Sequence, residues 1–283
     1  MIKEFLGIAP QPNGEGAYRP SPLALKLATS STTDYEAVHH SSPYQGARRR
    51  VLMLCTEIGQ MVMKNGKKFA TGNHPVEMLV PMLHLRDAGF EIDIFTPSGA
   101  PAQIESWAMP GEDEAVQVLY AEYRPKFEQP RSLADFTVQE MYGNLDYLAV
   151  FIPGGHGALL GLPTDPSVQQ LLKWSREQGL YILSICHGPA ALLAEQNERP
   201  FPYEGYSIAA FPDAVDKITP LIGYMPGRLP WKFGKKLKSL GVTIVNKNAD
   251  STCHVDRKLI TAASPEAANE FGKTAVQELL KAN

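Results

Sequence analysis

The fold of this chain is decided by the stretch Leu180-Tyr-Ile-Leu-Ser-Ile-Cys186-His187-Gly188-Pro189-Ala-Ala-Leu-Leu-Ala194. Its first part is mostly apolar and β-favouring, which predicts a short buried strand. The Cys-His-Gly-Pro segment predicts a sharp turn, and the Ala/Leu run after it favours a helix. A strand that breaks directly into a helix places the residue at the turn on the carboxyl edge of a sheet. Cys186 is therefore expected at a nucleophile elbow.

Cys186 stands before the amino end of the predicted helix, where unpaired N–H groups and the helix dipole favour negative charge. A thiol in this place is expected to ionise more easily than a free cysteine and to act as a nucleophile. An isolated cysteine is more often a small buried hydrophobe. The histidine that follows and the strand-to-helix turn favour the reactive interpretation.

The composition is that of an ordinary globular protein, with 44% hydrophobic residues, 20% charged residues and a net charge of −3 over 283 residues. A chain of this length can hold one large α/β domain with a smaller appendage. The charge balance indicates neither a nucleic-acid partner nor an anionic membrane. No apolar run approaches the ~18 residues that a membrane-spanning helix needs.

The cysteines and the amino terminus together predict a cytoplasmic protein. Cys55, Cys186 and Cys253 lack the spacing of a metal finger and are too few for a disulfide framework. Met1 to Phe5 does not show the basic and then apolar pattern of a signal peptide. We therefore expect reduced thiols in the cytoplasm.

The domain organisation predicted from the pattern is an arm followed by one body. Residues 1–48 carry several prolines, a Ser/Thr cluster and scattered tyrosines, and they predict an amino-terminal arm that packs on the body or on a partner subunit. Residues 49–283 predict the α/β core domain. Residues 100–142 read as a small insertion with short helical pieces, among them one from Ser132 to Met141.

Strands and helices alternate along the core domain, which predicts a doubly wound, mostly parallel, flavodoxin-like α/β sandwich. The first unit is strand Arg50–Thr56, a helix that Asn73 can cap, and strand Phe90–Thr96. The remaining predicted strands are Tyr147–Ile152, Tyr206–Phe211, Val242–Val245 and a hairpin of Cys253–Asp256 with Lys258–Thr261. The remaining predicted helices are Asp165–Gln178, Trp231–Leu240 and Pro265–Lys281.

Candidate chemistry gathers at the carboxyl ends of these strands, where ligands bind in doubly wound sheets. The glycine pair in Pro153-Gly-Gly-His-Gly157 lets backbone N–H groups approach a bound oxygen, although it is also typical of a simple tight turn. Glu77 falls in a first helical turn, where an acid is also good capping. Asp213 and Asp216 follow a strand, where carboxylates often cap the next helix.

Five longer motifs together resemble the PfpI/ThiJ superfamily, and more closely its branch of glyoxalase III and heat-shock chaperones. The resemblance runs from about residue 50 to the end of the chain. Its motifs are Thr71-Gly-Asn-His-Pro-Val-Glu77, Phe151-Ile-Pro-Gly-Gly-His-Gly-Ala158, Cys186-His-Gly-Pro-Ala190, Ala210-Phe-Pro-Asp-Ala-Val-Asp216 and Ile222-Gly-Tyr-Met-Pro-Gly227.

The resemblance implies a role for each matching residue. Cys186 is then the nucleophile, His187 its acid/base partner and Asp216 the carboxylate that orients the histidine. Glu77 is then the acid that shares a proton with the Cys186 sulfur. The backbone N–H groups of Gly155 and His187 are implied as the oxyanion site.

The resemblance also implies the activity. Members of this branch convert methylglyoxal to D-lactate without glutathione or another cofactor, hold unfolded proteins and are linked to protein deglycation. A homodimer and a small dicarbonyl substrate are therefore expected here. A thiolate attacks the aldehyde, the Gly155 loop holds the oxyanion, and a base moves a proton between the two carbons. The sequence leaves both His187 and Glu77 open as that base.

The chain departs from the resemblance at a metal site of two histidines and one carboxylate. The matching positions read Arg86, Glu91 and Tyr123, so the carboxylate alone remains. His84 is near in sequence but lies roughly 200° around the helix axis from Arg86. We therefore expect no structural zinc, and an ion pair between Arg86 and Glu91 in its place.

Two other function classes fit the same residues. The first is a binding protein, in which the chain is a chaperone or a redox-stress sensor and the Cys186 site is vestigial. The second is a cysteine peptidase or amidase, which uses the same pairing of a nucleophile with a histidine. A narrow pocket excludes peptides, but pocket width cannot be read from a sequence.

Overall fold

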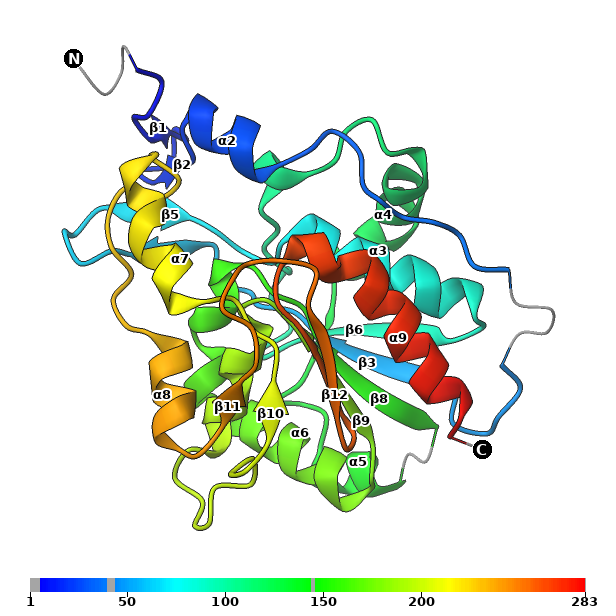
Figure 1. The fold of residues 1–283 in the computed structure, drawn as a ribbon. Coiled ribbons are helices and arrows are strands. Elements are labelled where there is room, and N and C mark those ends of the chain that lie inside the picture. Colours follow the sequence, from blue (N-terminus) through cyan, green and yellow to red (C-terminus); the bar gives the residue numbers. More distant parts are fainter. Residues whose placement is uncertain (1–5, 40–43, 144–145, 283) are drawn as a thin grey trace.

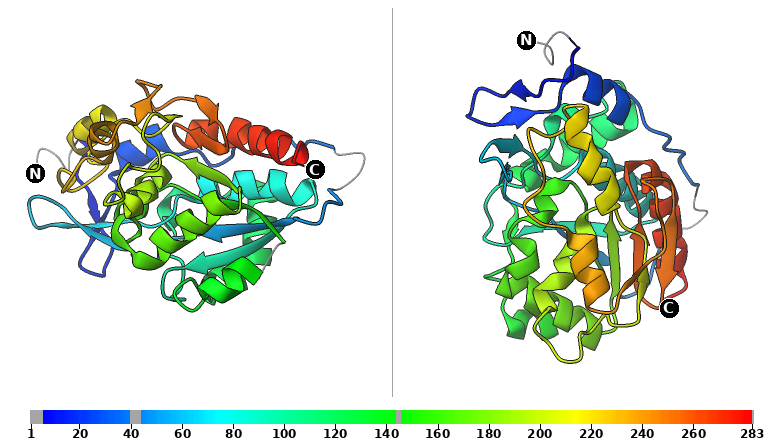
Figure 2. Two further views of the ribbon diagram at one scale, coloured as in Figure 1. Left: turned by 90° about the horizontal axis from the view of Figure 1, so that it is seen from below. Right: turned by 60° about the vertical axis from the view of Figure 1, so that its left-hand side comes forward.

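The computed structural model describes residues 6–39, 44–143 and 146–282, so residues 1–5 and 40–43 of the predicted arm lie outside the description. Within the described residues the chain forms three layers, with a central sheet between two layers of helices (Figure 1, Figure 2). This arrangement is the predicted α/β sandwich.

The central sheet is doubly wound and mostly parallel, as predicted. Its strands are Arg50–Leu54 (β3), Glu91–Thr96 (β6), Arg131–Ser132 (β7), Tyr147–Ile152 (β8), Tyr181–Ile185 (β9), Cys253–Asp256 (β12) and Leu259–Ala262 (β13). In the described residues their order is β12-β13-β9-β8-β3-β6-β7. All neighbours pair in parallel except β12 and β13. The chain starts at β3, builds one edge and then the other, so the winding reverses between β3 and β8.

Helices cover both faces of the sheet and create an apolar core on each (Figure 1, Figure 2). The first face carries α3 (Pro75–Asp87), α4 (Glu114–Glu128) and α9 (Ala268–Leu280), and the second carries α5 (Val138–Gly143), α6 (Pro166–Glu177) and the 3₁₀ helix η4 (Gly188–Glu195). Trp174 of α6 and Phe271 of α9 are among the largest fully buried side chains of the two cores.

The first strand–helix–strand unit is confirmed, but its cap is not the predicted one. Pro75 lies in the first turn of α3, and the N-cap residue is His74 rather than Asn73. The side-chain amide of Asn73 instead donates to the carbonyl of Thr56 and accepts from its N–H, both at 2.9 Å. Asn73 therefore ties the loop before α3 to the end of β3, and this tertiary contact replaces the local cap.

The region of residues 100–142 contains one long helix, α4, which is absent from the predicted elements. Asp113 caps this helix by accepting a hydrogen bond from the N–H of Val116 at 3.1 Å. The helix predicted from Ser132 to Met141 is wrong over its first half. Ser132 belongs to β7, which pairs with β6, and the helix α5 starts only at Val138.

The carboxyl-terminal third contains shorter elements than predicted. The strand predicted from Tyr206 to Phe211 is reduced to β10 (Ser207–Ile208), which pairs with β11 (Thr243–Ile244) in a separate small sheet. The helix predicted from Trp231 to Leu240 is α8 (Phe233–Ser239), and a further helix, α7 (Asp213–Ile218), was not among the predicted elements. The hairpin of β12 and β13 is confirmed, and Arg257 in its turn has a positive φ of 57°.

Short 3₁₀ segments join the larger elements. They are η1 (Ser106–Ala108), η2 (His156–Leu159), η3 (Leu162–Thr164), η5 (Thr219–Leu221) and η6 (Pro265–Ala267). None of the helices in the described parts of the chain is long and apolar enough to cross a membrane.

The amino-terminal arm lies along the body (Figure 1). It forms β1 (Gln11–Pro12), β2 (Tyr18–Arg19) and α2 (Pro22–Ala28), and β2 joins β5 (Lys68–Ala70) and β4 (Gln60–Val62) in a small sheet. The hydroxyl of Ser21 donates to the carbonyl of Ile222 at 2.7 Å. The hydroxyl of Tyr35 donates to the carboxylate of Asp87 at 2.5 Å. The arm is therefore fixed to the body both at Ser21, within its first half, and at Tyr35, toward its carboxyl end.

Candidate active site

Cys186 follows β9 directly and adopts a left-handed backbone conformation, with φ of 60°. Such a conformation is rare for a residue with a side chain and is held here by the surrounding strands. The N–H of Cys186 donates to the carbonyl of Ala262 at 2.8 Å, and its carbonyl accepts from Phe211 at 2.9 Å. At Gly188 a Cβ atom would lie 2.5 Å from the carbonyl oxygen of Ile152. The chain thus has no room for a side chain at Gly188, and after this glycine the elbow leads into η4, a 3₁₀ helix.

The expected partners of Cys186 lie beside it. The Cys186 Sγ is 3.2 Å from Nδ1 of His187, and Nε2 of His187 is 2.9 Å from Oδ2 of Asp216. Asp216 comes from the first turn of α7, which returns to the carboxyl edge of the sheet. All three side chains are buried, and Cys186 is 4% exposed. The structure thus brings together the three residues in the order thiol, imidazole and carboxylate.

His156 is a member of this cluster that was not assigned from the sequence. It begins η2, after the glycine loop that follows β8, and its Nε2 is 2.9 Å from Oδ1 of Asp216. The rings of His156 and His187 are 4.1 Å apart between centroids. Two histidines therefore share one carboxylate. The only sequence signal for His156 is its place in the glycine loop after the third predicted core strand.

Glu105 lies on the other side of His156 and was also not assigned. Its Oε1 accepts a hydrogen bond from the hydroxyl of Thr71 at 2.7 Å and from the N–H of His156 at 3.3 Å. Burial raises the pKa of Glu105, although the charge of His156 and the hydrogen bonds oppose this. Nothing in the residue pattern near Glu105 indicates this contact, because it forms only when the insertion folds against the glycine loop.

The shared carboxylate fixes the tautomers of the two histidines. Burial acts to raise the pKa of Asp216, but the charges of His187 and His156 and their hydrogen bonds outweigh it and lower that pKa. An ionised carboxylate only accepts hydrogen bonds, so both Nε2 atoms must carry protons. The lone pair of His187 Nδ1 therefore faces the Cys186 sulfur in the neutral imidazole.

The two histidines differ in their affinity for a second proton. Burial, and after it the charge of His156, lowers the pKa of His187. Burial also acts on His156, but the charge of Asp216 and its hydrogen bond outweigh it and raise the pKa of His156. His187 is therefore held as the neutral imidazole that a general base needs.

Glu77 reaches the same place from the first turn of α3 and is fully buried. A Cβ atom at Gly154 would lie 2.1 Å from Oε2 of Glu77 and 2.7 Å from the Cβ of Cys186, so this glycine allows the two side chains to meet. Burial raises the pKa of Glu77 to about 8, although contacts with the Cys186 thiol and the Gly155 N–H lower it. Neither carboxyl oxygen makes a hydrogen bond of full geometry. Glu77 is therefore mostly protonated at neutral pH.

The thiol of Cys186 does not ionise as easily as the sequence predicts. Burial, and after it the charge of Glu77, raises the pKa of Cys186 well above that of a free cysteine, while the N–H of Gly155 lowers it. The expected effect of the helix end is therefore outweighed by desolvation. A proton on Glu77 removes the repulsion between the two groups, so the pair holds one negative charge more easily than two.

Gly155 is placed as the resemblance implies, next to the reacting groups. Its φ is 97°, and a Cβ atom there would lie 2.3 Å from the carbonyl oxygen of Gly72 and 2.6 Å from the N of His74. A side chain is thus excluded on both conformational and steric grounds. The Gly155 N–H stabilises negative charge on both Cys186 and Glu77.

A cavity of about 500 Å³ lies beside this loop, between the arm and the start of α3. Arm residues 27–34 form one wall, and His74, Val76 and Ala108 form another. The N–H of His74 donates to the carbonyl of Gly154 at 3.0 Å, which links this wall to the loop next to Cys186. Burial lowers the pKa of His74 to about 3, and its Nδ1 has no partner. His74 is therefore a neutral imidazole with a free polar atom.

The predicted ion pair between Arg86 and Glu91 is wrong. Arg86 is 2.9 Å from the carboxylate of Asp87 and 3.6 Å from that of Glu122, and Glu91 is 3.1 Å from Arg49. Asp87 follows Arg86 directly, Glu122 lies in α4, and Arg49 precedes β3. The sequence pattern alone did not show that these charged residues, rather than Arg86 and Glu91, would pair. Each of the two expected partners therefore has another counter-ion.

Among the described residues, one group of side chains has the spacing of metal ligands, and it is the histidine–carboxylate cluster itself. His156, His187 and Asp216 place one ligand atom each within 4.8 Å of one another. Both Nε2 atoms already donate to Asp216. A cation among these three residues would have to displace both protons, so the arrangement fits a hydrogen-bonded network better than a metal centre.

Comparison with known proteins identifies the family. Residues 67–200 match the DJ-1/PfpI family. The protein/nucleic acid deglycase HchA of Pseudomonas aeruginosa (strain UCBPP-PA14) is 49% identical over 270 residues, which cover 94% of this chain and 92% of the relative. This chain belongs to the DJ-1/PfpI family. HchA of Staphylococcus aureus (strain MRSA252) is 46% identical and covers 95% of this chain and 92% of its own.

Solved structures share the DJ-1/PfpI fold of this chain. Glyoxalase III from Candida albicans has a TM-score of 0.65 at 20% identity, covering 84% of this chain and 99% of its own. The Rapid Encystment Protein of Francisella tularensis has a TM-score of 0.67 at 24% identity, covering 82% and 99%. At these identities the similarity shows the common fold. The DJ-1/PfpI match includes Glu77, Gly155 and Cys186, and it ends before Asp216.

Proposed function

We propose that this protein is a cysteine-dependent enzyme that converts methylglyoxal to D-lactate without glutathione, in the manner of a glyoxalase III. One observation carries the proposal: the Cys186 sulfur faces the Nδ1 of His187 at 3.2 Å and also contacts the protonated acid Glu77. A nucleophile in contact with both a base and an acid suits addition to a carbonyl followed by proton transfer.

The first step forms a bond between sulfur and carbon. His187 accepts the thiol proton at Nδ1, and the Cys186 sulfur attacks the aldehyde carbon of methylglyoxal. The carbonyl π electrons move to oxygen, where the Gly155 N–H holds the developing charge. Glu77 donates its proton to that oxygen, which gives a neutral hemithioacetal and leaves Glu77 as a carboxylate.

The second step moves hydrogen between the two carbons. The Glu77 carboxylate removes the hydrogen of the former aldehyde carbon while protonated His187 gives its proton to the ketone oxygen, which gives an enediol. Glu77 then returns a proton to the neighbouring carbon, and His187 accepts the hydroxyl proton of the former aldehyde carbon. The former aldehyde carbon becomes a thioester and the ketone becomes a hydroxyl, so one carbon is oxidised and the other reduced. Water then cleaves the carbon–sulfur bond and restores the thiol. The sum is methylglyoxal plus water to lactate, and no external oxidant or cofactor is needed.

Asp216 and His156 are proposed as positioning residues. Asp216 holds His187 by Nε2 and leaves Nδ1 free for the thiol proton. His156 occupies the other oxygen of Asp216 and thereby fixes the plane of the carboxylate. Neither residue contacts the sulfur, so both act through His187.

Deglycation and chaperone activity are proposed as further roles of the same protein. The relatives in Pseudomonas and Staphylococcus are named protein/nucleic acid deglycases, and removal of a dicarbonyl adduct begins with the same attack by sulfur on carbon. Leu27, Ile218 and Leu221 are exposed apolar side chains that favour binding of unfolded clients. We further propose that the protein is a homodimer in the cytoplasm and acts in the response to carbonyl stress.

The competing enzyme class, a cysteine peptidase or amidase, is less well supported. A peptide substrate needs an open cleft around the nucleophile, whereas Cys186 is only 4% exposed. A small dicarbonyl fits such restricted access better than a polypeptide does.

The test is incubation of the purified protein with methylglyoxal in the absence of glutathione. Loss of the dicarbonyl and the chirality of the lactate are followed together. Enzymatic formation of D-lactate supports the proposal. Loss of dicarbonyl without lactate, or no turnover at all, contradicts it and leaves the binding-protein interpretation.

A further inference from the structure

The motif Ile222-Gly-Tyr-Met-Pro-Gly227 takes no part in the chemistry proposed for Cys186, yet it brings a tyrosine to the active site. The ring of Tyr224 lies 5.7 Å, between centroids, from the ring of His156. The ring of His156 is in turn 4.1 Å from that of His187, whose Nδ1 faces the sulfur. Tyr224 therefore borders the pair of histidines that share Asp216.

Other aromatic side chains hold the Tyr224 ring in a fixed orientation. Trp107 meets it edge to face, with 5.6 Å between the centroids, and Phe69 lies 6.0 Å away. Phe69 is fully buried in β5 and also contacts the ring of His156, at 5.7 Å. Tilted and edge-to-face ring pairs at such distances are favourable. The Tyr224 ring is therefore packed against neighbours that restrict its rotation.

The loop that carries Tyr224 is itself fixed by the amino-terminal arm. The N–H of Ser21 donates to the carbonyl of Gly223 at 2.9 Å, and the Ser21 hydroxyl donates to the carbonyl of Ile222 at 2.7 Å. Gly223 has a φ of 74°, and a Cβ atom there would collide with the carbonyl oxygen of Ile8. The arm thus holds the backbone immediately before Tyr224.

The hydroxyl of Tyr224 is free to bind a ligand. It has no hydrogen-bond partner among the described residues, and the side chain is only partly buried. Burial raises the pKa of this phenol well above its ordinary value, and so do the nearby charges of Glu105, Cys186, Glu77 and Asp216. The hydroxyl therefore lies close to the reacting groups and stays protonated at neutral pH, as a hydrogen-bond donor.

We propose that the Tyr224 hydroxyl contacts the substrate and donates a hydrogen bond to the ketone oxygen of methylglyoxal. This inference rests on the function proposed for Cys186. The aldehyde oxygen already has the Gly155 N–H as a donor. Negative charge develops on the ketone oxygen when the hydrogen of the neighbouring carbon is removed, and a second donor stabilises this charge while His187 delivers its proton. Tyr224 keeps its own proton throughout, so the balance of the reaction is unchanged.

The test compares Tyr224→Phe with the parent protein in two assays. The first measures kcat and KM for methylglyoxal without glutathione. We expect kcat to fall by ~10²-fold and KM to stay within ~3-fold, because the hydrogen bond strengthens as charge develops on the oxygen. The second measures inhibition of this turnover by propanal, which can form a hemithioacetal with Cys186 but has no ketone oxygen. Its inhibition constant should change by less than ~2-fold, because the sulfur and the donor to the aldehyde oxygen are intact.

Tyr203→Phe is the matched control. The hydroxyl of Tyr203 also has no hydrogen-bond partner, but its ring packs against Phe201 and Tyr206 instead of the histidines. Removal of this hydroxyl leaves no polar group unpaired, so kcat and the propanal constant should both stay within ~2-fold of the parent values.

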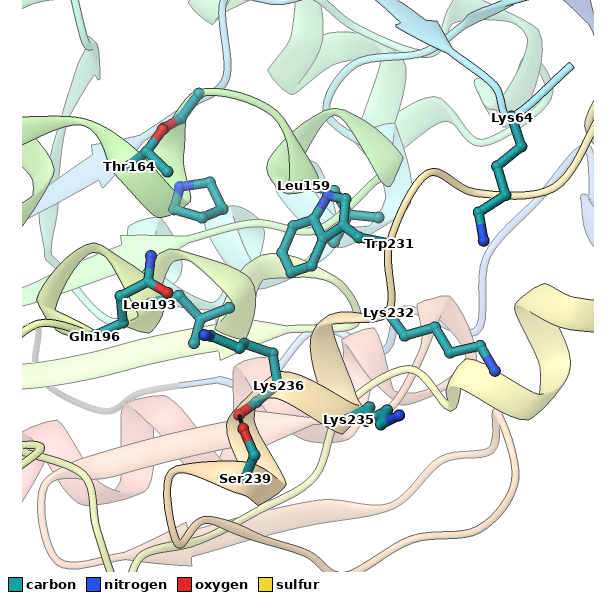
Figure 3. Close-up of a pocket in the computed structure, with 12 residues that line it drawn as sticks. Lys64, Leu159, Thr164, Leu193, Gln196, Trp231, Lys232, Lys235, Lys236 and Ser239 are labelled. Carbon is teal, nitrogen blue, oxygen red and sulfur yellow. Dashed lines mark hydrogen bonds between the residues drawn. The ribbon is translucent and has the colours of Figure 1, made fainter. Parts of the chain in front are cut away.

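A second pair of variants tests whether the orientation of the phenol matters. Trp107→Ala removes the edge-to-face contact and is expected to lower kcat by ~10-fold while sparing inhibition by propanal. The control is Trp231→Ala. Trp231 lines a cavity of about 610 Å³ between α8 and the loop around η3, and Cys186 does not line this cavity (Figure 3). This variant should keep kcat within ~2-fold.

Thermal melting establishes that each variant is folded. Lactate formation by Tyr224→Phe at the parent rate overturns the inference and leaves the proposed function intact. An equal loss of methylglyoxal turnover and of propanal inhibition also overturns it, since the phenol then supports the Cys186 site as a whole and not the ketone oxygen. A parent protein that forms no lactate overturns the proposed function itself, and this inference with it.

Discussion

His156 and His187 donate hydrogen bonds to the two oxygens of the same carboxylate, that of Asp216, each at 2.9 Å. A single negative charge cannot stabilise two imidazolium ions that lie 4.1 Å apart in a buried site. A proton on one ring therefore disfavours a proton on the other. The pKa of His156 is raised and that of His187 is lowered, so the extra proton resides on His156. The neutral ring is the one that faces the thiol.

Replacement of His156 by phenylalanine is therefore expected to raise the pKa of His187. The variant loses the repulsive charge of His156, and the Asp216 carboxylate then accepts a hydrogen bond from His187 but no longer from residue 156. Because the base must be neutral, the acid limb of kcat/KM moves to higher pH, and on that limb kcat/KM falls by up to ~10-fold for a shift of one pH unit. At pH 8.5 the loss is expected to be much smaller. The measurement is kcat/KM for methylglyoxal from pH 5 to pH 9.

The matched control is His84→Phe, because His84 is also buried but bonds Asn269 at 2.8 Å on the far side of α3. It is expected to lower the melting temperature without moving the acid limb. An unmoved limb in His156→Phe would show that His156 has only a packing role.

Cys186→Ala is expected to reduce methylglyoxal turnover to background, a loss of more than ~10³-fold, because the attacking atom is gone. Circular dichroism and thermal melting should remain close to those of the parent protein. Cys253→Ala is the control, since its thiol is half-buried in the hairpin of β12 and away from the elbow. Cys55→Ala should also retain turnover, with a lower melting temperature because Cys55 is fully buried. Normal turnover in Cys186→Ala would rule out the proposed mechanism.

Glu77→Gln is expected to lower turnover by ~10²-fold or more, because glutamine donates a hydrogen bond but transfers no proton. It also has a consequence for stability. Burial raises the pKa of Glu77 from 4.5 to about 8, so the native state binds this proton more tightly than the unfolded chain does. The stabilisation from this group is complete below pH 4.5 and is lost as the pH rises through about 8.

The free energies of unfolding of the two proteins should therefore diverge with pH. Between pH 5 and pH 8.5 the parent should lose on the order of 4 kcal/mol relative to Glu77→Gln. Urea titrations of both proteins at the two pH values measure this difference. A constant difference would mean that Glu77 is already ionised at pH 5 in the native state.

The parts of the site that are contiguous in sequence could be predicted from it. Cys186 and His187 are neighbours, and the strand-to-helix pattern alone places them at the elbow. Glu77 was predicted by its helical turn and by the family motif, and Asp216 by the motif alone. The strand–helix–strand order likewise predicts the doubly wound sheet, because buried parallel strands read as continuous apolar runs.

The parts that depend on contacts between distant segments could not be predicted. The sharing of Asp216 by His156 requires η2 and α7 to meet, and neither segment carries a signal for the other. The raised pKa of Cys186 results from desolvation and from Glu77, whereas the sequence pattern showed only the helix end. Asn73 looks like a cap by its position, but Thr56 competes for its amide from another strand. Local preference was overridden by tertiary contacts in each case.

Deletion of residues 1–45 is expected to weaken the proposed homodimer. The arm that is removed contributes β2 to the small sheet and forms a wall of the cavity next to His74. We expect kcat to be retained and KM for methylglyoxal to rise, because the cavity loses that wall but the residues around Cys186 remain. Sedimentation velocity over a range of concentrations measures the dimer. Tyr35→Phe, which removes only the bond to Asp87, is the mild control. A deletion variant that dimerises like the parent would show that the arm is not at the interface.

Zinc is expected to be absent from the protein purified without chelator, because two of the three positions implied as ligands cannot bind it. Arg86 is a permanent cation, and burial raises the pKa of the Tyr123 phenol, which keeps it protonated at neutral pH. Glu91 alone cannot hold zinc without nitrogen or sulfur partners. Elemental analysis should find less than ~0.1 zinc per chain, and EDTA should not change the melting temperature.

The gain-of-function control is Arg86→His combined with Tyr123→His, which supplies two imidazoles near Glu91. This variant should take up zinc and melt at a lower temperature once EDTA is added. Stoichiometric zinc in the parent protein would show that Arg86, Glu91 and Tyr123 are not the positions that correspond to the metal site.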